Sequence, residues 1–167
     1  MAKTKSGATP TRRAIRGARL AAGAAIPAAP SLRYIESSAL LAALLEQDSA
    51  ALDALRSAGQ LVTSALTFAE ASRAIIRARI AGRLTPTAER AVVRALQIFE
   101  RRCAVVAVTD SVLARVGRPF PVEPIRTLDA VHLATAELLG EPPQLVTLVT
   151  RDKRVRDNAR ALGYRVV

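Results

Sequence analysis

The chain of 167 residues lacks most of the side chains from which proteins build covalent catalysts and transition-metal sites. It has one cysteine, Cys103, and one histidine, His132. A single cysteine can form neither an intramolecular disulfide nor a cysteine-based zinc site, and a single histidine cannot form a multi-histidine site. Any metal bound here must therefore be held by oxygen ligands. We interpret Cys103 as a half-buried apolar filler and not as a nucleophile.

Aromatic residues and long apolar runs are also scarce. Aromatics make up 3% of the chain although 50% of its residues are hydrophobic, so the expected core is aliphatic. No apolar run approaches the roughly 18 residues needed to cross a bilayer, and the Ala-rich segment 20–30 is interrupted by prolines. We therefore expect a soluble, cytoplasmic protein without a membrane segment.

Acidic residues are outnumbered, with 14 acidic against 25 basic residues and a net charge of +11. Residues 1–30 contain basic but no acidic residues and almost no large hydrophobic ones, which predicts a flexible basic tail. A targeting leader is the other interpretation of this segment. Most of the cations are arginines, which favours a polyanionic partner, although a high arginine content can also reflect genomic composition.

Residues 31–167 are expected to form one domain in which strands and helices alternate. The apolar pattern and its capping residues predict strands at 32–36, 61–63, 104–108, 145–150 and 164–167, with helices at 39–47, 49–58, 67–80, 87–100, after 110, 127–139 and 151–162. Ser37 and Ser38 are expected to cap the first helix, and the strand 104–108 is expected to be buried. Nearly continuous apolar strands separated by helices predict an α/β fold, a three-layer α/β/α sandwich around a mainly parallel sheet.

Ligands of such sheets bind beyond the carboxyl ends of the strands, and carboxylates occur at those places. Glu36 ends the first strand, Asp152 follows the strand 145–150, and Glu70 and Asp129 lie among apolar residues in two helices. Each has an ordinary explanation as well. Asp129 and Asp152 are suited to helix N-termini, and Glu70 can pair with an arginine on its own helix. Spacing alone does not separate these four acids from the others.

Four segments distinguish them through a family resemblance. YIESSAL at 34–40, SALTFAE at 64–70, RTLDAVHLATA at 126–136 and VTRD at 149–152 are similar in order and spacing to the signature segments of PIN-domain ribonucleases. The likeness covers about residues 32–167 and is closest to the VapC-type toxins of bacterial toxin–antitoxin pairs. The third segment is the most specific of the four.

The resemblance implies that Glu36, Glu70, Asp129 and Asp152 bind one or two Mg²⁺ or Mn²⁺ ions and are the catalytic residues. It implies an endoribonuclease in which a metal-activated water attacks an RNA phosphodiester, with a cognate antitoxin and a homodimer as further expectations. The family usually has Asp where this chain has Glu36, whose extra methylene moves the carboxylate by about 1.5 Å. The alternative is therefore a catalytically weak or inactive PIN-like module that binds RNA or a protein partner.

Residues around the four acids complete the expected site. Ser38 and Thr150 are expected to support it, or else to act as a helix cap and in strand-edge hydrogen bonding. Three cations beside Asp152 are expected either to bind RNA or to be solvated on a helix: Arg151, Lys153 and Arg154. His132 is expected to be structural. The helices at 39–45 and 67–80 are expected to form an antitoxin groove.

Overall fold

The computed structural model describes residues 32–167, so the predicted basic tail of residues 1–30 lies outside the described part. Five strands within residues 32–167 form one sheet in the order β3-β2-β1-β4-β5, and all neighbouring strands are parallel. The strands are β1 (Leu32–Ile35), β2 (Gln60–Ser64), β3 (Ala104–Val106), β4 (Val146–Val149) and β5 (Arg165–Val166). The predicted parallel sheet is confirmed.

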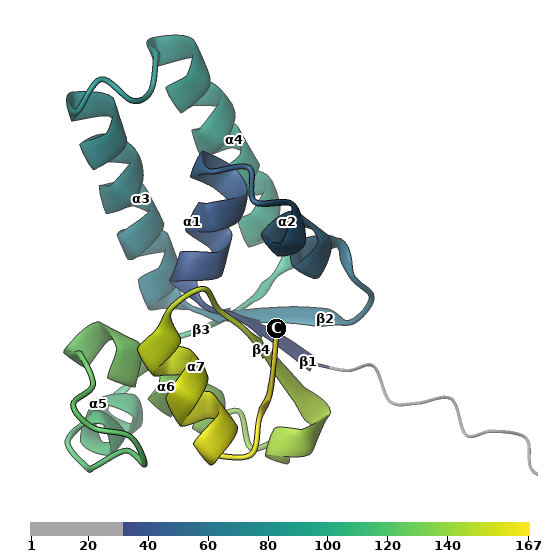
Figure 1. The fold of residues 1–167 in the computed structure, drawn as a ribbon, viewed down its shortest axis with the longest axis vertical. Coiled ribbons are helices and arrows are strands. Elements are labelled where there is room, and N and C mark those ends of the chain that lie inside the picture. The colour runs from purple at the N-terminus through teal and green to yellow at the C-terminus, as the bar shows by residue number, and fades with distance from the viewer. Residues whose placement is uncertain (1–31) are drawn as a thin grey trace, which may run out of the picture.

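In the described part of the chain, seven α-helices cover the two faces of this sheet (Figure 1). Those on one face are α1 (Ser37–Leu45), α2 (Ser49–Arg56), α3 (Ala65–Ile80) and α4 (Pro86–Arg102). Those on the other face are α5 (Asp110–Val116), α6 (Thr127–Glu137) and α7 (Lys153–Ala161). The predicted three-layer α/β/α architecture is therefore confirmed. Among residues 32–167, no helix is both long and apolar enough to span a bilayer.

Alternation along the central strand β1 supplies both halves of the core. Tyr34 packs with residues of α5, α6 and α7, whereas its neighbour Ile35 packs with residues of α1, α3 and α4. Successive side chains of a strand point to opposite faces, so one short strand anchors both helical layers. Apart from Tyr34, Tyr164, Phe99 and Phe120, the hydrophobic core is aliphatic, as expected.

Several helices begin at residue types that are favourable at the N-cap position. Asp48, Ser64, Thr85 and Thr109 accept hydrogen bonds from backbone N–H groups at the starts of α2, α3, α4 and α5. Helix α1 is an exception, and the predicted capping by Ser37 and Ser38 is wrong. Its N-cap is Glu36, whose side chain accepts from the Ser38 N–H, so the helix begins two residues earlier than predicted.

The third strand also differs from the prediction. It is not buried: β3 is an edge strand in which Ala104 and Val105 are exposed and Val106 is half-buried. An apolar, β-branched segment predicts a strand, but local sequence does not say whether that strand is central or at an edge. The predicted edge strand at the C-terminus is confirmed by β5.

The order of the strands defines where a ligand can bind. From β1 the chain runs to β2 and β3 on one side, and it later adds β4 and β5 on the other side of β1. The carboxyl ends of β1 and β4 therefore flank the point where the strand order reverses, which is the usual place for a ligand in an open α/β sheet. Glu36 directly follows β1, and Thr150 directly follows β4.

Candidate active site

Glu36 is buried and surrounded by donors from its own chain. Its Oε1 accepts from the Ser37 hydroxyl at 2.8 Å and from the Ser38 N–H at 3.0 Å. Its Oε2 accepts from the hydroxyls of Ser38 and Thr150, the latter at 2.8 Å. A carboxylate offers about four acceptor positions. The protein therefore supplies four donors to a side chain that is 3% exposed.

The two predicted supporting residues, Ser38 and Thr150, both contact Glu36. Ser38 also accepts from the backbone N–H groups of Arg151 and Asp152, at 2.8 and 3.0 Å, and so does not cap α1. Thr150 Oγ1 accepts from the Asp152 N–H at 3.0 Å. These bonds join the end of β1 to the segment after β4 and fix where Asp152 leaves the sheet.

Asp152 caps a helix and also belongs to the acidic cluster. Its Oδ1 accepts from the N–H groups of Arg154 and Val155, at 2.7 and 3.2 Å, at the start of α7. The capping interpretation is thus confirmed. It does not exclude a second role, because the cap uses Oδ1 and the negative charge of Asp152 still acts on Asp129.

Asp129 is the least satisfied acid of the four. Its Oδ2 is buried without a hydrogen-bond partner among the described residues. Burial raises the pKa of this carboxyl, and the nearby charges of Asp152 and Glu36 raise it further, against the opposing effects of Arg126 and His132. The charges of Glu36, directly after β1, and of Asp152, at the start of α7, thus act on Asp129 in α6 at one edge of the sheet.

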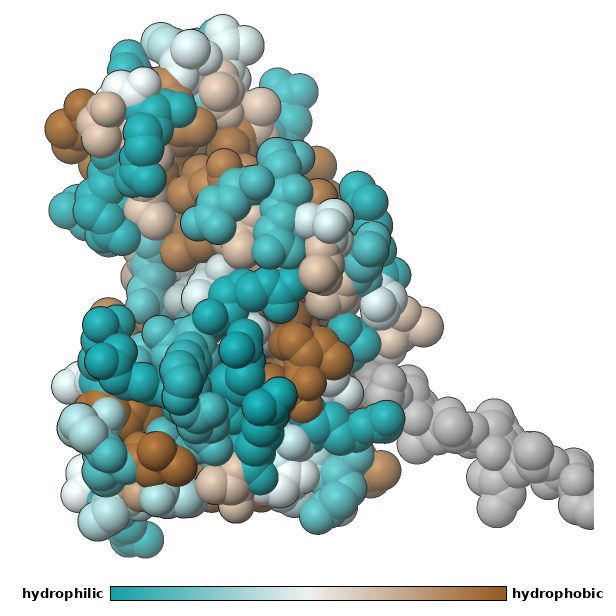
Figure 2. Space-filling view, in the orientation of Figure 1, coloured by the Kyte–Doolittle hydropathy of each residue, from teal (hydrophilic) through white to brown (hydrophobic). Residues whose placement is uncertain are grey.

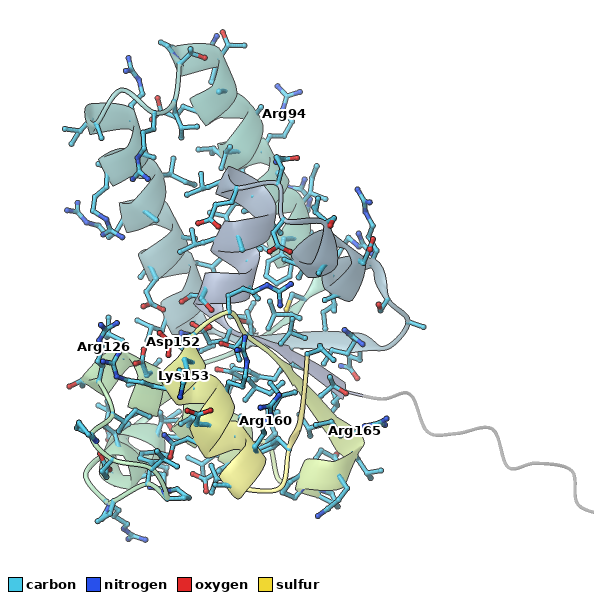
Figure 3. The ribbon with its side chains drawn as sticks, viewed as in Figure 1. Arg94, Arg126, Asp152, Lys153, Arg160 and Arg165 are labelled. Atoms are coloured by element: carbon cyan, nitrogen blue, oxygen red, sulfur yellow. The ribbon has the colours of Figure 1, made fainter. Side chains whose placement is uncertain are left out.

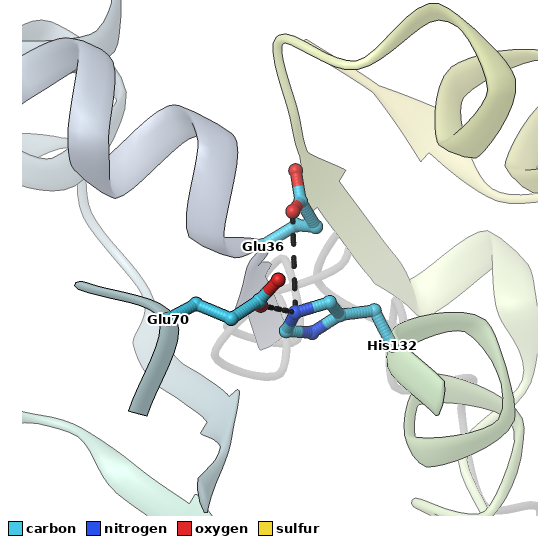
Figure 4. Close-up of side chains that lie close together, drawn as sticks. All are labelled: Glu36, Glu70 and His132. Carbon is cyan, nitrogen blue, oxygen red and sulfur yellow. Dashed lines mark hydrogen bonds and ion pairs between the residues drawn. The ribbon is translucent and has the colours of Figure 1, made fainter. Parts of the chain in front are cut away.

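Glu70 reaches the same place from α3 on the other helical layer. Its Oε2 lies 2.7 Å from Nε2 of His132, which is also 3.9 Å from Oε1 of Glu36 (Figure 4). Burial by itself would raise the pKa of Glu70. The hydrogen bond and charge of His132, with contributions from Ser37 and Arg77, hold that pKa below its ordinary value.

His132 lies at the acidic cluster, although the sequence predicted only a structural role for it. It follows Asp129 by three residues, which places both side chains on the same face of α6. In the structure, ligand atoms of Glu36, Glu70 and His132 lie within 4.8 Å of one another. The imidazole is 1% exposed, and its Nδ1 lies 3.0 Å from the buried Tyr34 hydroxyl. Tyr34 was read only as part of a strand, and no local pattern indicated its contact with His132.

The three cations beside Asp152 differ in their surroundings. Arg151 donates to Asp48 at 3.1 Å and thereby ties the segment after β4 to the start of α2. Lys153 pairs with Asp157 on the exposed surface of α7, and Arg154 is exposed. Hydrophilic side chains cover this helix, and Arg126, Asp152 and Lys153 lie at the end of the layer where α6 and α7 begin (Figures 2 and 3). RNA contact by Arg151, Lys153 and Arg154 stays a prediction.

An apolar groove lies on the other layer, and its lining differs from the predicted one. It has a volume of about 140 Å³ and is lined by α1, α2, α4 and β2, with Arg56 and Arg102 among its lining residues. Helix α3 contributes none of its lining residues, so this groove is not the one predicted from the segments 39–45 and 67–80. The contact of those two segments with an antitoxin stays a prediction. Helix α3 packs against α1 and α4, and its small residue Ala71 is buried in that core.

The fold is a parallel α/β/α sandwich, and acidic residues from four segments meet at one edge of its sheet. This combination is typical of small α/β proteins with an acidic site, and comparison with known sequences identifies the family. Residues 33–161 match the PIN domain family. Because this match spans most of the chain, the protein belongs to the PIN domain family, as the resemblance predicted.

Individual relatives agree with this assignment. The chain is 38% identical over 138 residues to "Ribonuclease VapC35" and 40% identical over 140 residues to "Ribonuclease VapC46", both of Mycobacterium tuberculosis. These matches cover 80% of this chain and 94% and 95% of the two relatives.

Solved structures show the same fold at low sequence identity. VapBC2 from Rickettsia felis, bound to a DNA fragment from its promoter, aligns with a TM-score of 0.56 and 11% identity over 81% of this chain and 97% of that chain. VapBC-1 from nontypeable Haemophilus influenzae aligns with a TM-score of 0.53 and 13% identity, over 81% of this chain and 96% of that chain.

Proposed function

We propose that this protein is a metal-dependent endoribonuclease of the VapC type. The observation that carries the proposal is the buried Oδ2 of Asp129, which has no hydrogen-bond partner within residues 32–167 and lies beside the charges of Asp152 and Glu36. An unpaired buried carboxylate is costly, and a divalent cation is the partner that offsets both its burial and the repulsion among its neighbours. The two curated relatives bear the name ribonuclease.

The donor set fits Mg²⁺ or Mn²⁺. Glu36, Glu70, Asp129 and Asp152 offer carboxylate oxygens, which hard divalent cations prefer. When bound, the metal lowers the pKa of a water and stabilises charge on the phosphodiester oxygens. Mg²⁺ and Mn²⁺ are both compatible with this set, and we propose Mg²⁺ as the cofactor, with Mn²⁺ as its substitute.

Residues around the four acids position the acidic side chains and provide positive charge for binding RNA. Ser38 and Thr150 hold the Glu36 carboxylate, and Ser38 also binds the backbone of Asp152. Because the acidic cluster repels a phosphate backbone, binding of RNA needs cations nearby. We assign this role to Lys153 and Arg154, and to Arg151 as far as its pairing with Asp48 permits.

We propose a cognate antitoxin as the protein partner and the groove between α1, α2 and α4 as its docking site. Leu40, Leu44 and Phe99 give the groove an apolar floor, while Arg56 and Arg102 give it positive charge. An amphipathic helix with acidic residues beside its apolar face complements both features. We further expect a homodimer that is located in the cytoplasm. Light scattering of the purified protein measures its mass in solution and so tests whether it is a dimer.

The direct test is cleavage of RNA by the purified protein. We expect cutting of single-stranded or structured RNA with Mg²⁺ or Mn²⁺, loss of cutting with a chelator, and recovery when the metal is restored. An Asp129→Ala protein that folds as the wild type should not cut. Cleavage that persists in this variant or in the presence of chelator would contradict the proposal.

A second candidate function is an inactive PIN-like module that binds RNA or protein. The observation in its favour is that Glu36 already accepts four hydrogen bonds from the chain. Calorimetric titration with Mn²⁺ separates the two functions. The nuclease should bind the ion and lose affinity in Glu36→Ala, whereas the inactive module should bind none.

A further inference from the structure

One ring nitrogen of His132 faces two carboxylates, and the other ring nitrogen contacts a tyrosine hydroxyl. Its Nε2 is 2.7 Å from Oε2 of Glu70 and 3.9 Å from Oε1 of Glu36, while its Nδ1 is 3.0 Å from the hydroxyl of Tyr34 (Figure 4). Tyr34 is 0% exposed and His132 is 1% exposed. Neither of these two side chains is therefore free to bond with bulk solvent, so the contact between them lies inside the protein.

The chemistry of the two ends sets the direction of these bonds. An ionised carboxylate only accepts hydrogen bonds, so the short contact with Glu70 requires a proton on Nε2 of His132. A tyrosine phenol has an ordinary pKa of about 10, so the Tyr34 hydroxyl carries its proton at neutral pH. With a neutral imidazole the Tyr34 hydroxyl donates to Nδ1, and with a charged imidazolium the Nδ1–H donates to the Tyr34 oxygen. The Nε2–H donates to Glu70 in both states.

These contacts connect three separate parts of the fold. Tyr34 is on the central strand β1, His132 is on α6 in one helical layer, and Glu70 is on α3 in the other layer. The Glu70 side chain is 22% exposed and has several rotamers, so a hydrogen bond from a rigid, buried ring restricts where its carboxylate lies. The same N–H faces Glu36, which lowers the repulsion between the two carboxylates.

We propose that His132 is a positioning residue for the acidic site, whose Nε2–H holds the Glu70 carboxylate in place, and that Tyr34 orients the imidazole for this purpose. The proposal rests on the proposed function in that Glu70 is taken as a metal ligand. It assigns roles to two residues outside the four acids. Partners of this kind behind metal ligands commonly change metal affinity by about 10–100-fold when removed.

Two substitutions of His132 test the position of the donor. His132→Gln places an amide N–H near the position of Nε2, whereas His132→Asn places it near the position of Nδ1 and leaves Glu70 without that donor. We expect Mn²⁺ affinity within about threefold of wild type for His132→Gln and at least about tenfold weaker for His132→Asn. The turnover number for RNA cleavage should fall in His132→Asn with little change in KM for RNA. Equal Mn²⁺ affinity in the wild type and His132→Asn would overturn the proposal.

The two tyrosines provide a matched pair for the second half of the proposal. Tyr34→Phe removes the hydroxyl beside Nδ1, and Tyr164→Phe removes a hydroxyl from a tyrosine that is also buried, at 5% exposed. We expect Tyr34→Phe to weaken Mn²⁺ binding by about threefold to tenfold and Tyr164→Phe to leave it unchanged. Equal effects of the two substitutions would remove Tyr34 from the proposal.

The wild-type protein itself offers a readout that does not depend on activity. Because His132 is the only histidine, a long-range ¹H–¹⁵N spectrum of untagged protein contains imidazole signals from this residue alone. We expect a proton on Nε2 in metal-free protein and the same proton after addition of Mg²⁺. Loss of that proton on addition of Mg²⁺ would make His132 a metal ligand and overturn the positioning role.

The same spectrum separates this proposal from the function on which it rests. A wild-type protein that binds no Mn²⁺ and cuts no RNA would contradict the proposed function. In that case the metal-free spectrum still decides the hydrogen bond. An Nε2 proton whose signal shifts in Glu70→Ala supports it, and an unprotonated Nε2 overturns it.

Discussion

Glu36 and Asp129 lie at the same edge of the sheet, yet the protein treats their carboxylates in opposite ways. Glu36 receives hydrogen bonds on both oxygens from Ser37, Ser38 and Thr150. Asp129 has a buried oxygen without a partner among residues 32–167 and a raised pKa. The Glu36 carboxylate after β1 therefore has all its hydrogen-bond partners without any ligand, whereas the Asp129 carboxylate at the start of α6 does not.

This difference means that Glu36 stabilises the fold, whereas Asp129 serves the proposed metal site at the expense of stability. Removing Glu36 leaves buried donors without an acceptor, so its carboxylate supports the native structure. The charge of Asp129 has the reverse effect, because it is partly buried beside Asp152 and Glu36, and Arg126 and His132 offset this only in part. Functional residues commonly reduce stability in this manner. The two carboxylates should consequently respond to substitution in opposite directions.

The largest effect is expected for Asp129→Asn. RNA cleavage should fall by at least about 100-fold, since one charged group that contributes to stabilising the reaction is lost. The metal-free protein should at the same time become more resistant to urea, because a repelled, partly buried charge is removed. Cleavage rates and urea unfolding midpoints measure the two effects. Asp53→Asn, the same change on the exposed surface of α2, is the control and should alter neither.

Glu36→Ala should have the next largest effect, with stability and metal affinity falling together. The hydroxyls of Ser37, Ser38 and Thr150 lose their acceptor and α1 loses its cap, so the free energy of unfolding should fall by about 3 kcal/mol. Urea titration measures the first effect and Mn²⁺ calorimetry the second. Glu46→Ala, an exposed change at the far end of α1, should cost little. A Glu36→Ala protein as stable as that control would refute the stabilising role.

The pH dependence of the free energy of unfolding should show that the ionised Asp129 carboxylate reduces stability. Its pKa is raised above the ordinary 3.8 by burial and by Asp152 and Glu36, while Arg126 and His132 oppose the shift. The native state therefore binds this proton more tightly than the unfolded state, and stability falls as pH rises from about 4 through the native pKa. The free energy of unfolding of metal-free wild type, minus that of Asp129→Asn, should decrease over this range. A flat difference would contradict the raised pKa.

The smallest effect is expected for the surface cations. Arg154→Ala should weaken RNA binding about threefold and reduce the slope of log affinity against log salt by about 0.7, as for one lost contact with single-stranded RNA. Arg94→Ala removes the same charge from α4, away from the acidic cluster (Figure 3), and should change neither quantity. Fluorescence anisotropy at several salt concentrations measures both. Equal losses in the two variants would mean that only net charge matters.

Most of the fold was predictable because its signals are local. Apolar runs, Gly82 at a positive φ between two helices, and caps such as Thr85 followed by Pro86 set the elements within a residue or two. The position of β3 at the sheet edge was not predictable, since it depends on strand order and not on the apolar character of the segment itself. The capping of α1 by Glu36 was missed because Ser is the commoner N-cap residue.

The site was predictable in part. Family resemblance selected the four acids, and the structure brings their segments to one edge of the sheet. The place of His132 in this site was missed because its partners, Glu70 and Tyr34, are 62 and 98 residues away along the chain. A single histidine has no internal pattern that reports such distant contacts. The unequal surroundings of Glu36 and Asp129 were hidden for the same reason.

The donors around Glu36 also constrain how this sequence can change over time. A shorter side chain at position 36 would draw the carboxylate away from Ser37, Ser38 and Thr150, whose hydroxyls now converge on it. A change to Asp alone should therefore lengthen or break some of these hydrogen bonds. The length of the side chain at position 36 and the three hydroxyls that surround it thus constrain one another.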